Sequence, residues 1–227
     1  MPTRRAPTPP RPELEDALFA NQPSFETWLE SNHESSPGIW CLFAKKDSGQ
    51  VSVTYKEAVA VALCFGWIDG QARTSDREGF FRVRFVQRRP RSVWSKINRD
   101  KVLGLIESGR MRPSGMAQVE VAKTNGQWDR AYDGASTAVV PPDLQAALKK
   151  NAGARAFFKT LDRTNRYSVL WRVQTAASPA TRARRIETLV DKLARHETFH
   201  AMAEPARKAK EAVPKARSRK KTGGSGK

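Results

Sequence analysis

Alternating apolar and polar side chains mark the clearest strand of the chain, at residues 80–89. A glycine-containing turn separates this run from residues 67–76, so the two segments are predicted to form an antiparallel hairpin. Residues 39–46 are expected to be a further short strand. Such a sheet would be half-buried, with one apolar face and one basic face. The apolar face would carry Phe81, Val83 and Phe85, and the basic face Arg82 and Arg84.

Capping residues predict two helices in the first half of the chain. Thr54 and Glu57 match a capping box, in which each side chain accepts a hydrogen bond from the other residue's backbone N–H. The helix that they open is apolar nearly all round as far as Phe65, which is typical of a buried central helix. Ser24 is expected to cap an earlier helix that ends near His33.

Helical spacing dominates the chain from Ser114 onward. The last helix is predicted to have Ser178 as its N-cap and Pro179 as its first residue. We therefore predict an α+β fold, in which a small antiparallel sheet with packed helices is followed by an all-helical C-terminal part. The predicted organisation is a disordered N-terminal arm (1–21), an α+β domain (22–132), a linker (133–142), a helical domain (143–200) and a disordered basic tail (201–227).

Composition narrows the class of protein. A chain of 227 residues with 39% hydrophobic residues can bury an ordinary core. Its longest apolar run, residues 58–65, is far shorter than the roughly 20 residues that cross a bilayer, so no membrane span is expected. The opening residues lack the apolar segment of a secretion signal, which favours a cytoplasmic location. Cys41 and Cys64 lack CxxC spacing and are expected to be small buried hydrophobes.

The formal charge of +18 is concentrated at the two ends of the chain. Residues 1–12 contain three arginines and no acid, and residues 205–227 contain nine basic residues against Glu211 alone. A basic tail of this kind can bind nucleic acid weakly and non-specifically through counterion release, or it can serve only solubility. The candidate nucleic-acid residues are Arg207, Lys208, Lys210, Lys215, Arg217, Arg219, Lys220 and Lys221.

Three arginines crowd the joint between the predicted hairpin and the next helix. Pro90 is expected to end the strand and Ser92 to cap a helix that runs to about Ser108, with Trp94 in the core. Guanidinium groups beside the free N–H groups of a helix start favour a small anionic ligand. Alternatively, the arginines are solvated or paired with Asp69, Asp76 and Glu78. The candidate anion-binding residues are Arg84, Arg88, Arg89, Arg91, Ser92 and Lys96.

Two further clusters of polar residues are candidate sites. A polar pocket could gather where the helix ends meet the sheet, although a surface network of ion pairs explains the same residues. Its members would be His33, Asp69, Gln71 and Ser95, beside the arginines of the joint. In the last helix, Arg182, Arg184 and Arg185 lie in the first turns, where cations oppose the helix dipole, and this indicates an acidic partner.

One stretch matches a catalytic metal motif. HETFH, from His196 to His200, has the HExxH pattern, and on a helix its two histidines could bind zinc with Glu197 as general base. Glu204 lies about 12 Å along a helix axis from His196 at 1.5 Å per residue and cannot complete that site. Solvated residues at a helix end are therefore the favoured interpretation, and no metal is expected. The motifs GxSxG, GxGxxG and GxxxxGK[ST] are absent, so no cofactor and no catalytic residue is predicted.

Several segments resemble a known family. They are GIWCLFAKK, TYKEAVAVALCFGWIDGQ, RRPRSVWSKIN, GMAQVEVAKTNGQW, PPDLQAALKKN and TRARRIETLV, in the expected order over residues 22–195. They are similar to the YdeI/OmpD-associated family of bacteriocin-protection proteins. The resemblance implies a cytoplasmic protein linked to antimicrobial-peptide resistance and the stress response, with no agreed catalytic residues. A non-catalytic anion-binding protein is thus the favoured hypothesis. The alternatives are a nucleic-acid-associated protein and an unrecognised enzyme, and the oligomeric state is not defined.

Overall fold

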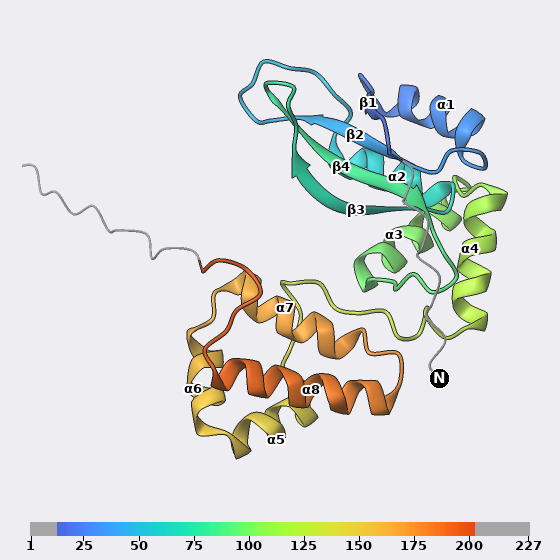
Figure 1. The fold of residues 1–227 in the computed structure, drawn as a ribbon. Coiled ribbons are helices and arrows are strands. Elements are labelled where there is room, and N and C mark those ends of the chain that lie inside the picture. Colours follow the sequence, from blue (N-terminus) through green and yellow to red (C-terminus); the bar gives the residue numbers. More distant parts are fainter. Residues whose placement is uncertain (1–12, 203–227) are drawn as a thin grey trace, which may run out of the picture.

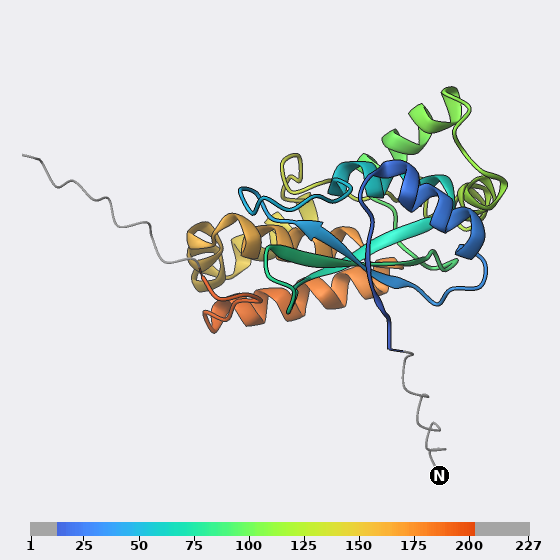
Figure 2. The same cartoon turned by 90° about the horizontal axis from the view of Figure 1, so that it is seen from above.

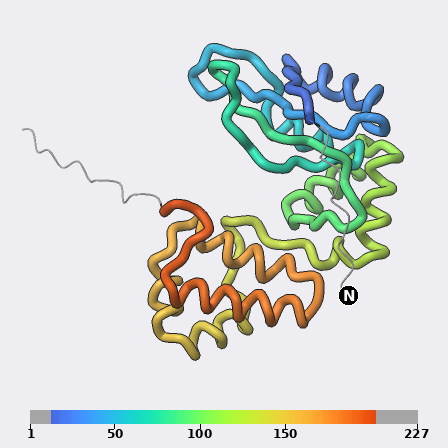
Figure 3. Tube along the Cα trace, viewed as in Figure 1, coloured from blue at the N-terminus to red at the C-terminus, as the bar shows by residue number. Residues whose placement is uncertain are grey.

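The computed structural model describes residues 13–202, which form an α+β unit followed by a helical unit (Figure 1). This arrangement confirms the predicted fold class. The chain passes from the first unit to the second through the segment after α4, and Figure 3 follows that passage. Each unit has its own cluster of buried hydrophobic side chains.

The α+β unit contains a mixed sheet of four strands in the order β1-β2-β4-β3. The strands are β1 (Asp16–Leu18), β2 (Ile39–Ala44), β3 (Trp67–Thr74) and β4 (Phe80–Gln87). The predicted hairpin is present, because β3 and β4 pair antiparallel, with a register shift between Asp69 and Ala72. Helices α1 (Gln22–Asn32) and α2 (Tyr55–Cys64) lie on one face of the sheet (Figure 2). The opposite face carries the predicted arginines, and Arg73 and Arg82 each lie 5.1 Å from the ring centre of Trp40.

Strand β1 corrects the predicted boundary of the N-terminal arm. Residues 1–21 were expected to be disordered, whereas Asp16–Leu18 pair parallel with β2 and make the sheet mixed rather than purely antiparallel. The strand is anchored by an ion pair between Asp16 and Arg82 at 2.8 Å and by burial of Phe19 behind it. Three residues are too few for an alternating pattern, so the sequence alone did not indicate this strand.

Local capping chemistry explains where the helices begin. Thr54 accepts a hydrogen bond from the Glu57 N–H, and the Glu57 carboxylate accepts one from the Thr54 N–H at 2.9 Å, so the predicted capping box opens α2. In α1 the N-cap is Asn21, whose side chain accepts a hydrogen bond from the Ser24 N–H at 3.0 Å. Ser24 is thus the third residue of the helix and completes a reciprocal box with Asn21, rather than acting as the cap itself.

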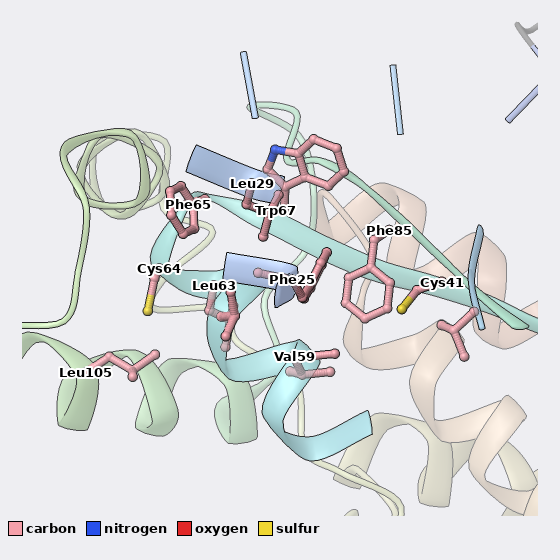
Figure 4. Close-up of a cluster of buried hydrophobic side chains, with 14 of the residues drawn as sticks. Phe25, Leu29, Cys41, Val59, Leu63, Cys64, Phe65, Trp67, Phe85 and Leu105 are labelled. Atoms are coloured by element: carbon pink, nitrogen blue, oxygen red, sulfur yellow. The ribbon is translucent and has the colours of Figure 1, made fainter. Parts of the chain in front are cut away.

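Helix α2 is the buried centre of the first core, as its apolar sequence predicted (Figure 4). Phe25 of α1 packs near the Phe85 ring, with the ring centres 5.7 Å apart. Helices α3 (Lys96–Glu107) and α4 (Pro113–Thr124) complete this unit. Helix α4 approaches α2 closely at Gly115, where a β-carbon would lie 2.1 Å from the carbonyl oxygen of Cys64.

The helical unit consists of α5 (Pro142–Lys150), α6 (Ala152–Thr160), α7 (Arg163–Gln174) and α8 (Pro179–Ala194). Helix α8 begins as predicted, with Ser178 as N-cap and Pro179 in the first turn. It packs against the other three helices and contributes four of the twelve members of the second core. Those members are Ile186, Leu189, Val190 and Leu193.

Candidate functional site at the strand-to-helix joint

The joint between β4 and α3 has a different backbone from the predicted one. Ser92 does not cap the helix; its hydroxyl accepts a hydrogen bond from the Arg89 N–H at 3.0 Å and closes a turn. Ser95 is the N-cap of α3 and accepts a hydrogen bond from the Asn98 N–H. The helix begins later because a backbone bridge to Tyr132 keeps the preceding residues extended. The Tyr132 backbone N–H donates to the Trp94 carbonyl, and the Tyr132 carbonyl accepts from the Lys96 N–H, each at 2.9 Å.

Arg88 is buried at this joint, with only 5% of its surface exposed. Its guanidinium lies 3.6 Å from the ring centre of Trp94, and Nη1 donates to the Val93 carbonyl at 3.2 Å. The Nε and Nη2 atoms have no hydrogen-bond partner among the described residues. Burial lowers the pKa of Arg88 to about 10, against the opposing charges of Tyr132 and Asp69. The group is therefore positively charged at neutral pH.

The charges of Asp69 and Tyr132 act on Arg88, while Tyr55 contacts Asp69 and Ser95 contacts Tyr132. We call these residues the joint cluster: Tyr55, Asp69, Arg88, Ser95 and Tyr132. The Tyr55 hydroxyl donates to Oδ2 of Asp69 at 2.5 Å. Burial, with the Asp69 carboxylate, raises the pKa of Tyr55, and burial likewise raises the pKa of Tyr132. Both hydroxyls are thus protonated at neutral pH; that of Tyr55 is already used by Asp69, and that of Tyr132 can donate a hydrogen bond.

The joint cluster offers mainly hydrogen-bond donors. A guanidinium with two free N–H groups matches the oxygen pair of a carboxylate or the oxygens of a phosphate. Stacking on Trp94 fixes the plane of that group. A tyrosine that acts as a base or nucleophile near neutral pH needs a lowered pKa, and the shifts of Tyr55 and Tyr132 have the opposite direction. The free donors of the cluster are those of the Arg88 guanidinium, and they are of the kind that carboxylate and phosphate oxygens accept.

The remaining predicted anion-binding residues do not join Arg88. Arg89 and Arg91 are exposed, and Lys96 pairs with Asp133 at 2.7 Å. Arg84 lies on the opposite face of the sheet beside Gly70, because it alternates with the buried Phe85 along β4. The alternative prediction was that the three arginines are solvated or paired with Asp69, Asp76 and Glu78. Exposure of Arg89 and Arg91 agrees with solvation, whereas within residues 13–202 these acids form no ion pair with the three arginines.

The predicted polar pocket is only partly assembled. Asp69 and Ser95 both face Tyr132, and thus lie in the joint cluster. His33 instead ends α1, where its Nδ1 contacts the Leu29 carbonyl at 2.9 Å, and Gln71 is exposed on β3. The sequence reasoning missed Tyr55 and Tyr132. Tyr55 could have been found as a polar residue in the first turn of an apolar helix, whereas no local pattern indicates Tyr132.

The HETFH segment does not form the geometry of a zinc site. Helix α8 ends at Ala194, and His196 has a φ angle of 58°, so the two histidines do not share a helical face. The His196 ring stacks on Phe157 at 4.7 Å, and Nε2 of His200 contacts the Ser168 hydroxyl at 2.8 Å. Residues 13–202 contain no group of three or more His, Cys, Asp or Glu side chains that could hold a metal ion.

Glu197 is held in ion pairs rather than left solvated. Its carboxylate contacts Arg195 at 2.8 Å and Lys192 at 2.6 Å, and these partners lower its pKa to about 2. It is ionised and paired at neutral pH, and so is a poor general base. The predicted nucleic-acid residues, from Arg207 to Lys221, lie outside the described part of the chain.

The fold and the joint cluster define a two-part α+β protein with a buried arginine between a strand and a helix. No helix in the described range has the length and apolar character needed to span a bilayer. Residues 137–196 match the family described as bacteriocin-protection, YdeI or OmpD-associated, so the chain carries a domain of that family over its helical unit. Residues 17–118 match a different family, a domain of unknown function (DUF8412). No match was found among the curated proteins or the solved structures.

These two matches assign the segments of the resemblance seen in the sequence to two different families. The family segments of the helical unit, PPDLQAALKKN and TRARRIETLV, lie within the matched range. The joint and the sheet lie within the range of the other family, which has no described function. The bacteriocin-protection family therefore gives no guidance on the joint cluster, and its function rests on its own chemistry.

Proposed function

We propose that this chain is a cytoplasmic, non-catalytic protein that supports resistance to bacteriocins and related stress by binding a small anionic ligand at the joint cluster. The observation that carries this proposal is the buried Arg88 guanidinium, in which two nitrogen atoms, Nε and Nη2, have no partner in the described residues. The family domain at residues 137–196 supports the link to bacteriocin protection.

The energetics of burial favour a ligand at Arg88. Leaving a buried hydrogen-bond donor unsatisfied costs about 1–3 kcal/mol, and more when the group is charged. Asp69 lies close enough to act on the charge of Arg88, but its carboxylate accepts the hydrogen bond of Tyr55. A ligand carboxylate or phosphate would supply acceptors for Nε and Nη2 and would neutralise the charge.

The charge of the whole chain favours an indirect role in protection. At +18, the protein repels cationic antimicrobial peptides rather than sequestering them. Protection would then follow from the bound ligand or from a partner that senses the liganded state.

A thermal-shift experiment with Arg88→Lys tests this function. Lysine keeps the positive charge but lacks the planar pair of donors, so it binds carboxylate and phosphate without the same geometry. We expect inorganic phosphate or citrate to raise the melting temperature of the wild-type protein, since a ligand at 100 times its Kd stabilises by about 2.7 kcal/mol. The ligand-induced rise is expected to disappear in Arg88→Lys and to persist in Arg89→Lys, which changes an exposed neighbour.

Tyr132→Phe provides a second test that keeps the packing of the ring. Loss of one hydroxyl donor is expected to weaken phosphate or citrate binding about fivefold, since a neutral hydrogen bond contributes about 1 kcal/mol. An unchanged ligand response in both Arg88→Lys and Tyr132→Phe would show that the anion does not bind at the joint cluster.

The basic tail supports a second candidate function, the binding of nucleic acid. Nine of the 41 basic residues lie in residues 205–227 beside a single acid. Deletion of this segment is expected to abolish binding of duplex DNA, and the duplex affinity of the intact chain is expected to fall steeply with salt concentration. A deletion of residues 222–227, which removes one lysine, is the control and should retain most of the affinity. Retained DNA affinity after the longer deletion would place the binding elsewhere in the chain.

A further inference from the structure

A groove of about 540 Å³ runs between α7 and α8 on the helical unit, and it shares no lining residue with the joint cluster. Its volume lies in the range of small-molecule sites, about 300–1,000 Å³. Among residues 13–202, no acidic side chain lines it. The lining residues that matter here are four cations and two aromatic rings: Arg172, Arg184, Arg185, Lys192, Trp171 and Phe199.

Three of the four cations lack a carboxylate partner within residues 13–202. Arg172 donates to the Ser168 carbonyl at 2.8 Å, and Arg185 donates to the Arg172 carbonyl at 2.7 Å, so both are bonded to neutral oxygens. Arg184 is exposed, and its side chain forms no hydrogen bond or ion pair with the described residues. Only Lys192 is neutralised, by Glu197. The groove therefore carries about three uncompensated positive charges.

These charges also act against one another. Burial lowers the pKa of Arg172, and the charge of Arg185 lowers it further. Arg184 and Arg185 lie in the first half of α8, where the helix dipole adds to the positive potential. An anion in the groove would reduce the repulsion between the arginines. It would also offset the unfavourable interaction of Arg184 and Arg185 with the positive end of the helix dipole.

The aromatic residues narrow the class of anion. The Phe199 ring is occupied, because Arg172 lies 3.6 Å from its centre and Lys192 lies 5.5 Å from it. Trp171 is only half-buried; its aromatic contact is with Tyr132, at 6.2 Å and nearly perpendicular. A half-exposed indole beside a row of guanidinium groups is the combination that binds a nucleotide, with the base stacked on the ring and the phosphate on the cations.

We propose that the groove between α7 and α8 binds a nucleotide unit, with its phosphate on Arg172, Arg184 and Arg185 and its base against Trp171. The unit could be a free nucleotide or part of a single strand of nucleic acid, because both present the same base and phosphate. Trp171 contacts Tyr132 of the joint cluster, so the groove is tested at Arg184 and Thr188, which lie outside that cluster.

Calorimetric titration of the full-length protein tests the proposal. The probes are AMP, a tetradeoxyadenylate, adenosine, pyrophosphate and hexaglutamate. AMP or the tetradeoxyadenylate is expected to bind more tightly than adenosine or pyrophosphate, because only these two present base and phosphate together. Tighter binding of AMP would identify a free nucleotide as the ligand, and tighter binding of the tetradeoxyadenylate would identify a nucleic-acid strand.

Variants locate the binding within the groove. Arg184→Gln removes an exposed, unpartnered cation and is expected to weaken binding of the better probe about tenfold. Thr188→Glu places a carboxylate in the groove and should weaken binding at least as much. The control is Arg155→Gln, which removes an exposed arginine of α6 outside the groove and leaves the basic tail unchanged. Equal binding by Arg184→Gln and Arg155→Gln, or equal binding of pyrophosphate or hexaglutamate, would overturn the proposal.

Discussion

Replacing Trp94 by alanine is expected to lower the free energy of unfolding by about 3–5 kcal/mol, the usual cost of removing a buried tryptophan or phenylalanine. Trp94 is 3% exposed, and its ring centre lies 5.0 Å from that of Trp128. The Arg88 guanidinium stacks on the Trp94 ring, so the variant also removes the cation–π contact of that buried charge. Urea unfolding followed by circular dichroism measures the change.

Trp40→Ala is the matched control for this experiment, because it removes the same side chain from a half-buried position on the open face of the sheet. Its cost is expected to be well below that of Trp94→Ala, since less apolar surface is buried there. Trp94→Phe keeps an aromatic ring, so its loss of unfolding free energy is expected to lie between those of Trp94→Ala and Trp40→Ala. Equal losses in Trp94→Ala and Trp40→Ala would contradict the central role of Trp94 in the joint.

Gly115→Ala is the second substitution with a large expected effect. The new β-carbon would lie 2.1 Å from the carbonyl oxygen of Cys64 and 2.8 Å from its carbonyl carbon. Both atoms belong to the backbone of α2, so the conflict cannot be relieved by a side-chain rotation. We expect a loss of about 3 kcal/mol, at the upper end of the usual cost of overpacking, because α4 must move away from α2. Thermal and urea unfolding of the purified variant measure this loss.

Gly104→Ala is the control that distinguishes the effect of the close α4–α2 contact at Gly115 from the general effect of alanine in a helix. Gly104 lies within α3 and has no heavy atom within 4 Å of the position of a β-carbon. Alanine there is expected to stabilise the protein by about 0.5–1 kcal/mol, because glycine loses more backbone freedom on folding. A stabilising effect at both glycines would show that α2 and α4 do not pack as closely as described.

Short-range patterns predicted most of the elements correctly. The alternation of Phe81, Val83 and Phe85 with arginines requires a half-buried strand, and the Thr54 box requires a helix start, because both depend only on neighbouring residues. The predictions were wrong where two neighbouring residues could make the same hydrogen bond. Ser92 and Ser95 can both accept a backbone hydrogen bond, and the choice between them depends on the distant Tyr132.

The candidate site was predictable only in part for the same reason. Arg88 and Asp69 were both considered from the sequence, but their proximity depends on the antiparallel pairing of β3 with β4. The sequence did not distinguish Arg88 from Arg89 and Arg91, because burial of one arginine among three is decided by the Trp94 ring that packs on it. The α7–α8 groove was indicated only by the misplaced cations of the last helix.

The register shift in β3 bears on how copies of this protein meet one another. Strand β3 is an outer strand of the sheet, so one side of its backbone is left without a neighbouring strand. The irregularity between Asp69 and Ala72 interrupts the straight row of N–H and C=O groups, and Arg73 adds charge to the same strand. Bulges and charges of this kind disfavour strand addition. The fold thereby disfavours edge-to-edge polymerisation through β3, its longest free edge strand, even at the high concentrations reached during overexpression.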